Sequence, residues 1–437
     1  MLKVPNIFSI RYFKEYLYSL VGNSSRLFIA DLSSQLIAFL QVIMIVRFLG
    51  ATSYGLITLV VVYVTIINQL IDFRIKEAVV KYLSEFLIKN DRERIWASLK
   101  LFYLIDFITG VIAFLLAFLT AGLIATFIIH DAQAVSLVQL FAFMLLVSTL
   151  NGTCSGVLTV FEKFTALSVY TIAVAIMRFI FVAIILLLGY GARGVLTGYI
   201  AASVFSSAII LAFCINIIKK SVWFPGIAGK IALIKPRSRE IAMFLINTNF
   251  NESLALVTKN IDILILGYFR APGEVGFYRL AKNFVEILSL LSSSVYTAIY
   301  PQFSKLWADN KISEFKDLIK RITMFMGILA LPIAGAMFLG APWIINIFIG
   351  AGFLPVVFAV RVMIWGFITA VVFLWVRPVF LSMGKPGILT IANTINAVIM
   401  VILSLIRYDE GDFFRNLNNS LEAYHGRNKN FRFKRFQ

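Results

Sequence analysis

Residues Leu56 to Val62 read LITLVVV, an apolar stretch without the alternation of polar and apolar positions that is typical of a transmembrane β-strand. Similar apolar runs recur along the chain, and several exceed the roughly 20 residues of α-helix needed to cross a bilayer core. The sequence therefore predicts an all-α, polytopic membrane protein.

The composition excludes a soluble protein. Of the 437 residues, 60% are hydrophobic and 14% are charged, and the mean hydropathy is +0.90, whereas a soluble domain is about 45 to 50% apolar. Both cysteines, Cys154 and Cys214, lie within apolar runs, where a thiol behaves as a small hydrophobic group. The only histidines are His130 and His425, and no glycine-rich phosphate loop follows a strand. We therefore expect no enzyme active site, no bound metal and no cofactor.

Apolar runs bounded by charged residues, Gly or Pro predict eleven membrane spans. They cover residues 27–48, 55–73, 101–127, 135–159, 167–189, 195–217, 241–268, 277–299, 322–348, 355–381 and 388–406.

Basic residues concentrate in alternate connections. Four Lys or Arg residues precede the first span, and the loops at 74–100, 219–239 and 305–321 contain seven, six and five. By the positive-inside rule, these loops and the N-terminus face the cytoplasm in the cell's inner membrane. Topology thus explains much of the net charge of +18, which gives no case for nucleic-acid binding.

The chain contains an internal repeat. An offset of 221 residues aligns Ser53-Tyr54-Gly55-Leu56 with Glu274-Val275-Gly276-Phe277, Phe86 with Trp307 and Asp31 with Glu252. Repeats of six spans share one orientation, so they are related by an axis along the membrane normal. The repeat predicts two helical bundles around a central cleft.

Five regions follow from the spans and the repeat. They are a cytoplasmic segment (1–26), a six-helix first half (27–218), a cytoplasmic basic linker (219–240), a second half of five predicted spans (241–406) and a polar, basic tail (407–437). The repeat predicts a twelfth span where the tail stands. An eleven-span chain also places this tail outside, against the positive-inside rule. Either one span is miscounted or re-entrant, or the C-terminus departs from the ancestral pattern by truncation or an altered reading frame.

Arg178 stands at the centre of span 167–189. A charge at the centre of a span costs about 2.5 to 3.5 kcal/mol on insertion scales, so by default it indicates a water-filled path or a partner. No carboxylate lies three or four residues from Arg178. The arginine either binds an anionic substrate group in the cleft or makes a structural hydrogen bond to another helix.

Span 241–268 is the most polar of the eleven. Glu252, Lys259 and Asp262 are spaced by seven and three residues and share one helical face. Lys259 is therefore a second candidate for anion binding. Asp262 either neutralises Lys259 or joins Glu252 and Asp31 as a candidate for coupling to a proton or sodium gradient. For Asp31, an ordinary interfacial carboxylate is the alternative.

Lys282 is the third candidate for the cationic cleft. It lies four residues before Glu286 in span 277–299, so a self-satisfied ion pair between the two is the alternative.

Four motifs resemble the polysaccharide biosynthesis flippases of the multidrug, oligosaccharidyl-lipid and polysaccharide exporter superfamily. They are RFLGATSYGL at 47–56, DILILGYF at 262–269, VGFY at 275–278 and PQFS at 301–304. The resemblance covers about residues 20 to 405 and implies two six-helix lobes around a cationic cavity. The final span of the second lobe is missing.

The resemblance implies a flippase that moves an undecaprenyl-pyrophosphate-linked oligosaccharide across the cytoplasmic membrane by ion-coupled alternating access, for surface polysaccharide such as O-antigen or capsule. Its partners would be this lipid-linked sugar, the bilayer, a coupling proton or sodium ion and the polysaccharide polymerase machinery. A multidrug or cation exporter of the same superfamily is the first alternative. An integral-membrane polymerase or glycosyltransferase is the second, although the outer connections are too short for the acid and base residues such enzymes need.

Overall fold

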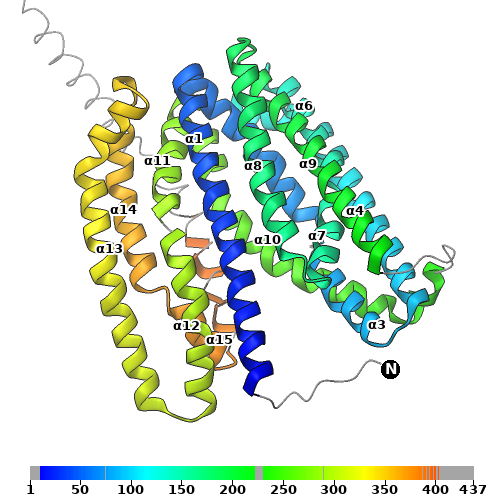
Figure 1. Ribbon diagram of the computed structural model, residues 1–437. Helices are drawn as coiled ribbons and strands as arrows, with labels where there is room; N and C mark the ends of the chain where they lie inside the picture. The colour runs from blue at the N-terminus through cyan, green and yellow to red at the C-terminus, as the bar shows by residue number, and fades with distance from the viewer. Residues whose placement is uncertain are drawn as a thin grey trace, which may run out of the picture.

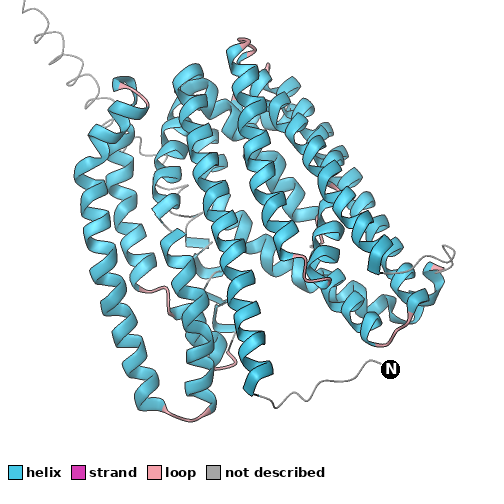
Figure 2. Ribbon diagram, viewed as in Figure 1, coloured by secondary structure: helices cyan, strands magenta, loops and turns pink. Residues whose placement is uncertain are grey.

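The computed structural model describes residues 10–73, 75–221, 230–288, 290–385, 387–389, 391–392, 394–396, 398–399 and 402. Within these helices, the side chains of residues 10–24, 221, 247, 250–258, 290–294, 296–298 and 301 lie outside the description. All regular secondary structure in the described ranges is helical (Figure 2). This confirms the all-α fold class.

The first half is built from α1 to α9. Helix α1 (Ile10–Ile71) reverses at Gly50, whose φ of 80° is readily adopted only by glycine. Three short segments follow, α2 (Ile75–Ala78), a π-helical turn (Val79–Leu83) and α3 (Ser84–Ile88). The next elements are α4 (Arg92–Leu119), the short α5 (Ala121–Ile124) with a π-helical turn (Ala125–Ile129), α6 (Ala134–Ser148), α7 (Asn151–Val160), α8 (Phe164–Leu187) and α9 (Gly191–Ser221).

The linker and the second half are also helical. A 3₁₀ turn (Ile231–Arg237) leads into α10 (Ser238–Phe269). The remaining elements are α11 (Pro272–Leu288), α12 (Leu290–Ala308), α13 (Ile312–Phe348), a 3₁₀ turn (Ala351–Phe353), α14 (Val356–Val372) and α15 (Val376–Ser382).

Helices cover each of the first ten predicted spans, apart from short turns. Among the described residues, 7 helices are long and apolar enough to cross a membrane, and the first contains two predicted spans that meet at Gly50. Helices α10, α11 and α12 cover two further spans but are shorter or more polar. The last predicted span, 388–406, and the tail, 407–437, lie largely or wholly outside the described residues.

The fourth span of each half is broken at a similar place. Helices α6 and α7 are separated at Thr149 and Leu150, and α14 and α15 are separated at residues 373–375. An offset close to that of the repeat relates the two breaks. The shared discontinuity supports the internal repeat.

The helices form two groups with α1 between them (Figure 1). Helices α11 to α15 lie on one side, and α4 and α6 to α9 lie on the other. The start of α1, helix α3 and the turn between α12 and α13 all lie at one end of the bundle. The predicted basic connections therefore share one end, which we call the basic end; the opposite end, at Gly50, is the outer end.

The two halves meet most closely at the outer end, where α1 crosses α11. A Cβ atom at Gly55 would overlap the carbonyl oxygen of Pro272, and one at Gly276 would overlap the carbonyl oxygen of Ala51. Only glycine permits backbones to approach so closely. Gly55 and Gly276 are equivalent under the 221-residue offset, so the outer contact follows the symmetry of the repeat.

Buried apolar residues form two separate clusters. One joins both halves at the outer end and includes Val60 of α1 and Leu280 of α11. The other lies at the basic end of the first half and includes Phe86, together with Ile241 and Leu245 from the first turns of α10. The halves therefore share a core at the outer end, whereas the start of α10 packs with the first half at the basic end.

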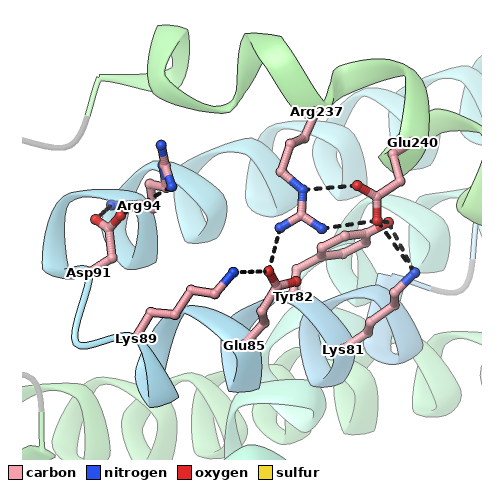
Figure 3. Close-up of polar contacts among 8 residues, drawn as sticks. All are labelled: Lys81, Tyr82, Glu85, Lys89, Asp91, Arg94, Arg237 and Glu240. Atoms are coloured by element: carbon pink, nitrogen blue, oxygen red, sulfur yellow. Dashed lines mark hydrogen bonds and ion pairs between the residues drawn. The ribbon is translucent and has the colours of Figure 1, made fainter.

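An ion-pair network fastens the linker to the first half (Figure 3). Arg237 donates to both oxygens of Glu240, at 2.9 and 3.0 Å, and to Oε1 of Glu85 at 2.8 Å. The Tyr82 hydroxyl donates to Glu240 at 3.2 Å, and the Arg237 guanidinium lies 5.2 Å from the Tyr82 ring centroid. We call these four residues the linker clamp.

The linker clamp predicts a pH-dependent stability. Hydrogen bonds from Arg237 hold the pKa of Glu240 below its ordinary value of 4.5. A carboxyl group whose pKa is lowered by folding stabilises the protein above its unfolded-state pKa, and the stabilisation is lost as pH falls through the folded value. At neutral pH we expect a higher Tm for the wild type than for Arg237→Gln, and this difference should vanish well below pH 4.5.

Arg239→Gln is the matched control for this melting experiment. Arg239 is exposed and forms no ion pair with the described residues. Its removal should leave Tm nearly unchanged at every pH. A difference between the wild type and Arg237→Gln that stays constant with pH would contradict the role given to Glu240.

Candidate functional site

Arg178 lies at the middle of α8, as its sequence position predicts. Its guanidinium carbon lies 5.5 Å from the ring centroid of Tyr199 on α9, a cation–π distance. The Nε atom of Arg178 is buried and has no hydrogen-bond partner among the described residues. Because a buried unmade hydrogen bond costs about 1 to 3 kcal/mol, this donor is available to a ligand that enters the site.

Arg279, on α11 of the second half, is a second buried guanidinium. Its Nη1 atom is buried without a partner among the described residues, and its Nη2 atom lies 3.7 Å from Oε2 of Glu286. The Tyr54 hydroxyl of α1 accepts a hydrogen bond of 2.8 Å from Nδ2 of Asn283, which lies one turn after Arg279 on α11. Arg279 thus stands where α11 meets α1.

The two arginines lie on α8 and α11, both of which pack against α1. Arg178 lies over the Tyr199 ring, and Arg279 lies one turn before Asn283, which bonds to Tyr54 of α1. The first arginine comes from the first half and the second from the second half. We call Arg178, Arg279, Tyr54 and Tyr199 the arginine site. Planar guanidinium groups match phosphate oxygens in geometry as well as charge.

The sequence analysis singled out Arg178 but missed Arg279. Arg279 is the third residue of the predicted span 277–299, a position where a long cation ordinarily reaches the interface. Its spacing of seven residues from Glu286 puts both on one helical face, and that spacing could have drawn attention to it.

Lys282 makes a different ion pair from the one that its spacing suggests. Its Nζ atom lies 2.7 Å from Oδ2 of Asp262 and donates to the backbone carbonyl of Lys259 at 2.6 Å. The Tyr278 hydroxyl also donates to Asp262, at 2.6 Å. The alternative pairs, Lys282 with Glu286 and Asp262 with Lys259, are therefore wrong. Contact between α10 and α11 overrides spacing along a single helix.

Lys259 contacts this ion pair through its backbone carbonyl, and the other predicted site residues form no described ion pair with it. The Lys259 side chain is exposed and forms no ion pair with a described carboxylate. Asp31 is exposed on α1, and Lys76 is the charge that acts on it. Glu252 lies within α10, and its side chain is outside the described residues. Roles for these three residues in binding or coupling stay predictions.

Asp106 is a buried carboxylate that the sequence analysis did not single out. It lies on α4, and its side chain is 5% exposed. Its Oδ2 atom accepts hydrogen bonds from the backbone N–H of Thr153, at 3.0 Å, and from the Thr153 hydroxyl. As the sixth residue of span 101–127, it could have been found by the same rule that singled out Arg178.

The family profile of polysaccharide biosynthesis proteins matches residues 20–307. An uncharacterized membrane protein of Methanocaldococcus jannaschii is 22% identical over 309 residues, which make up 67% of this chain. The match spans 60% of that relative's own length.

Two solved structures have a similar fold. The lipid II flippase MurJ, in an inward closed conformation, gives a TM-score of 0.67 at 14% identity and covers 86% of this chain and 80% of its own. An inward-facing multidrug resistance transporter of the MATE family and MOP superfamily gives a TM-score of 0.63 at 13% identity. That match covers 86% of this chain and 95% of the transporter.

The fold is thus one that this chain shares with solved membrane transporters and a solved flippase. The motifs at 47–56, 262–269, 275–278 and 301–304 all lie within the matched range. The chain therefore belongs to the polysaccharide biosynthesis protein family and has the fold of the multidrug, oligosaccharidyl-lipid and polysaccharide exporter superfamily.

Proposed function

We propose that this protein is a flippase for an undecaprenyl-pyrophosphate-linked oligosaccharide used in surface polysaccharide synthesis, such as O-antigen or capsule. The observation that carries the proposal is the arginine site, in which Arg178 and Arg279 present buried, unpartnered N–H groups from opposite halves. Lys259, exposed on α10, is proposed as a further contact for the anionic headgroup.

The chemistry of the substrate fits this site. A pyrophosphate bearing a hydrophilic glycan cannot enter hydrocarbon without losing its hydration, which is strongly unfavourable for a charged group. Guanidinium donors replace those lost hydrogen bonds by charge-assisted ones. A ligand held from both halves also responds to their relative movement, as alternating access requires.

The proposal includes a location and partners. The basic end would face the cytoplasm, with the N-terminus on that side of the inner membrane, because the basic connections gather there. The flipped sugar-lipid would then be delivered to polymerase machinery on the outer face.

Rescue of a flippase-deficient strain tests the arginine site. Arg178→Gln and Arg279→Gln should each reduce flipping about tenfold, since each removes a charge-assisted hydrogen bond worth about 1.5 kcal/mol or more. The measurement is the rate at which lipid-linked repeat units reach the outer leaflet, with membrane insertion checked separately.

Arg47→Gln provides the matched control, because Arg47 is exposed on α1 and its replacement removes the same charge outside the arginine site. Flipping should be unaffected. If both site variants flip at the wild-type rate while inserted normally, the arginine site has no part in transport.

A multidrug exporter is the second candidate, favoured by the fold shared with the MATE family transporter. The two functions predict opposite cavity charges, since a cationic drug is repelled by Arg178 and Arg279. Resistance to cationic dyes that rises on Arg178→Gln, with no change in lipid-linked sugars, would favour the exporter.

A further inference from the structure

We infer that Asp106 is a proton-binding site through which the first half couples transport to a proton gradient. This inference rests on the proposed flippase function. The three carboxylates at first considered for coupling differ from Asp106 in their setting: Asp31 is exposed, Asp262 is paired with Lys282, and the Glu252 side chain lies outside the described residues.

The surroundings of Asp106 balance its two protonation states. Burial opposes a negative charge on Asp106. The two donors of Thr153 and the N-terminus of α7 favour that charge. No described Lys or Arg side chain lies within ion-pair distance of Asp106. A carboxyl group without a cationic partner changes charge by binding or releasing a proton.

The neighbouring elements carry other titratable groups. Cys154 on α7 is a buried thiol that shares the Tyr103 hydroxyl of α4 with Cys214 of α9, at 3.4 and 3.2 Å. Helix α6 contains no charged residue. Helix α2, which packs against α7 and α4, carries Lys76 and Glu77, α4 itself carries Lys100, and Asp72 follows the end of α1. None of these groups forms a described ion pair with Asp106.

The contacts favour a proton over sodium as the bound ion. Sodium needs oxygen ligands that turn lone pairs toward it, but the Thr153 backbone N–H and hydroxyl both point hydrogens at Oδ2 of Asp106. A backbone N–H cannot ligate a cation. A proton needs only one carboxylate oxygen.

A purely structural capping role is not required by the fold. The equivalent break in the second half, between α14 and α15, forms without a side-chain cap at Trp375. The 221-residue offset places Gly327 opposite Asp106. Among the described residues, no carboxylate bonds to the break in the second half, so the discontinuity alone does not explain the presence of Asp106 in the first half.

The site is connected to the linker by direct packing. Helix α7 lies against Val79 and the Lys76 carbonyl at Gly156, where an added Cβ would meet them at 2.7 and 3.1 Å. Val79 begins the π-helical turn that carries Tyr82 of the linker clamp. A shift of α7 on protonation of Asp106 would thus reach the start of α10.

Reconstituted full-length protein tests the site with a fluorescent undecaprenyl-pyrophosphate-linked sugar as probe. If one proton is exchanged per cycle, a pH difference of about 1, acid on the acceptor side, drives about a tenfold accumulation of the probe. We expect this in wild-type vesicles and no accumulation with Asp106→Asn. An equal sodium gradient should have no effect.

Infrared difference spectroscopy provides a measurement that does not depend on flipping. A protonated-carboxyl band that titrates in the wild type should be absent in Asp106→Asn. In Thr153→Val, which removes the hydroxyl donor to the carboxylate, the band should titrate at higher pH. Thr153→Val also keeps the test open if Asp106→Asn does not fold.

Three results would overturn the inference. The first is that Asp106→Asn accumulates the probe as well as the wild type does, and the second is that wild-type flipping is unaffected by the pH gradient. The third is an infrared titration that neither variant changes. Wild-type protein that does not move the probe at all would instead refute the proposed flippase function, and the infrared titration would still decide whether Asp106 binds a proton.

Discussion

Gly276→Leu is expected to reduce flipping about a hundredfold while the protein still inserts in the membrane. The added side chain must lie where the Ala51 carbonyl now stands, and backbone on both sides cannot yield as a flexible side chain can. Overpacking of this kind costs about 3 kcal/mol. This cost corresponds to a shift of about a hundredfold in the conformational equilibrium, away from the state in which the outer end is closed. Gly55→Leu should behave alike, because it meets the Pro272 carbonyl.

Labelling of an introduced cysteine measures the position of the outer end directly. Thr58 is 5% exposed, and both native cysteines are fully buried, so Thr58→Cys reports with little background. In whole cells, a membrane-impermeant maleimide should label Thr58→Cys much faster when Gly276→Leu is present. Gly335→Leu is the control, because a Cβ there meets no atom within 4 Å. Equal labelling in all three backgrounds would show that the glycine contact does not close the outer end.

Lys282→Met is expected to destabilise the protein by about 3 to 5 kcal/mol, the usual effect of breaking a buried ion pair. The Lys282 and Asp262 side chains are only 16% and 14% exposed, so Asp262 would keep a poorly solvated charge without its cation. Thermal unfolding in detergent measures the loss. If Lys282 only bound substrate, Lys282→Met would leave the stability nearly unchanged and would affect only transport.

The double variant separates these two roles. Lys282→Met combined with Asp262→Leu removes both charges, so most of the lost stability should return. Lys259→Met serves as the control, since its side chain is exposed and forms no ion pair with a described carboxylate. If Lys282→Met unfolds at the wild-type temperature, the ion pair does not hold α10 to α11.

The fold could be predicted from the sequence wherever hydrophobicity alone decides it. Apolar runs such as 167–189 and 195–217 correspond to single helices, α8 and α9. The break between α6 and α7 could not be predicted, because residues 135–159 are predominantly apolar and the hydrogen bonds that stabilise the break involve Asp106 on another helix. Sequence periodicity predicts which residues share one face of a helix. It does not predict which hydrogen-bond donors and acceptors the neighbouring helices supply.

The candidate site was accessible to sequence reasoning only in part. Arg178 stands out because nothing near it in the sequence can neutralise it. Arg279 and Lys282, three residues apart on α11, look alike in the sequence, yet Arg279 lies near Glu286 of its own helix whereas Lys282 contacts Asp262 of α10. Their different partners depend on how α11 packs between α1 and α10, which is a property of tertiary structure.

The contact between Gly55 and Gly276 also bears on the origin of the chain. In a symmetric dimer, residues on the two-fold axis meet their own copies. Gly55 faces Gly276 across such an axis, each against the carbonyl of the residue four positions before the other, Ala51 or Pro272. A protein of half this length could therefore close the same contact as a homodimer, using one glycine twice. When the two copies are joined in one chain, each glycine can be substituted independently of the other. The two halves then no longer have to open symmetrically.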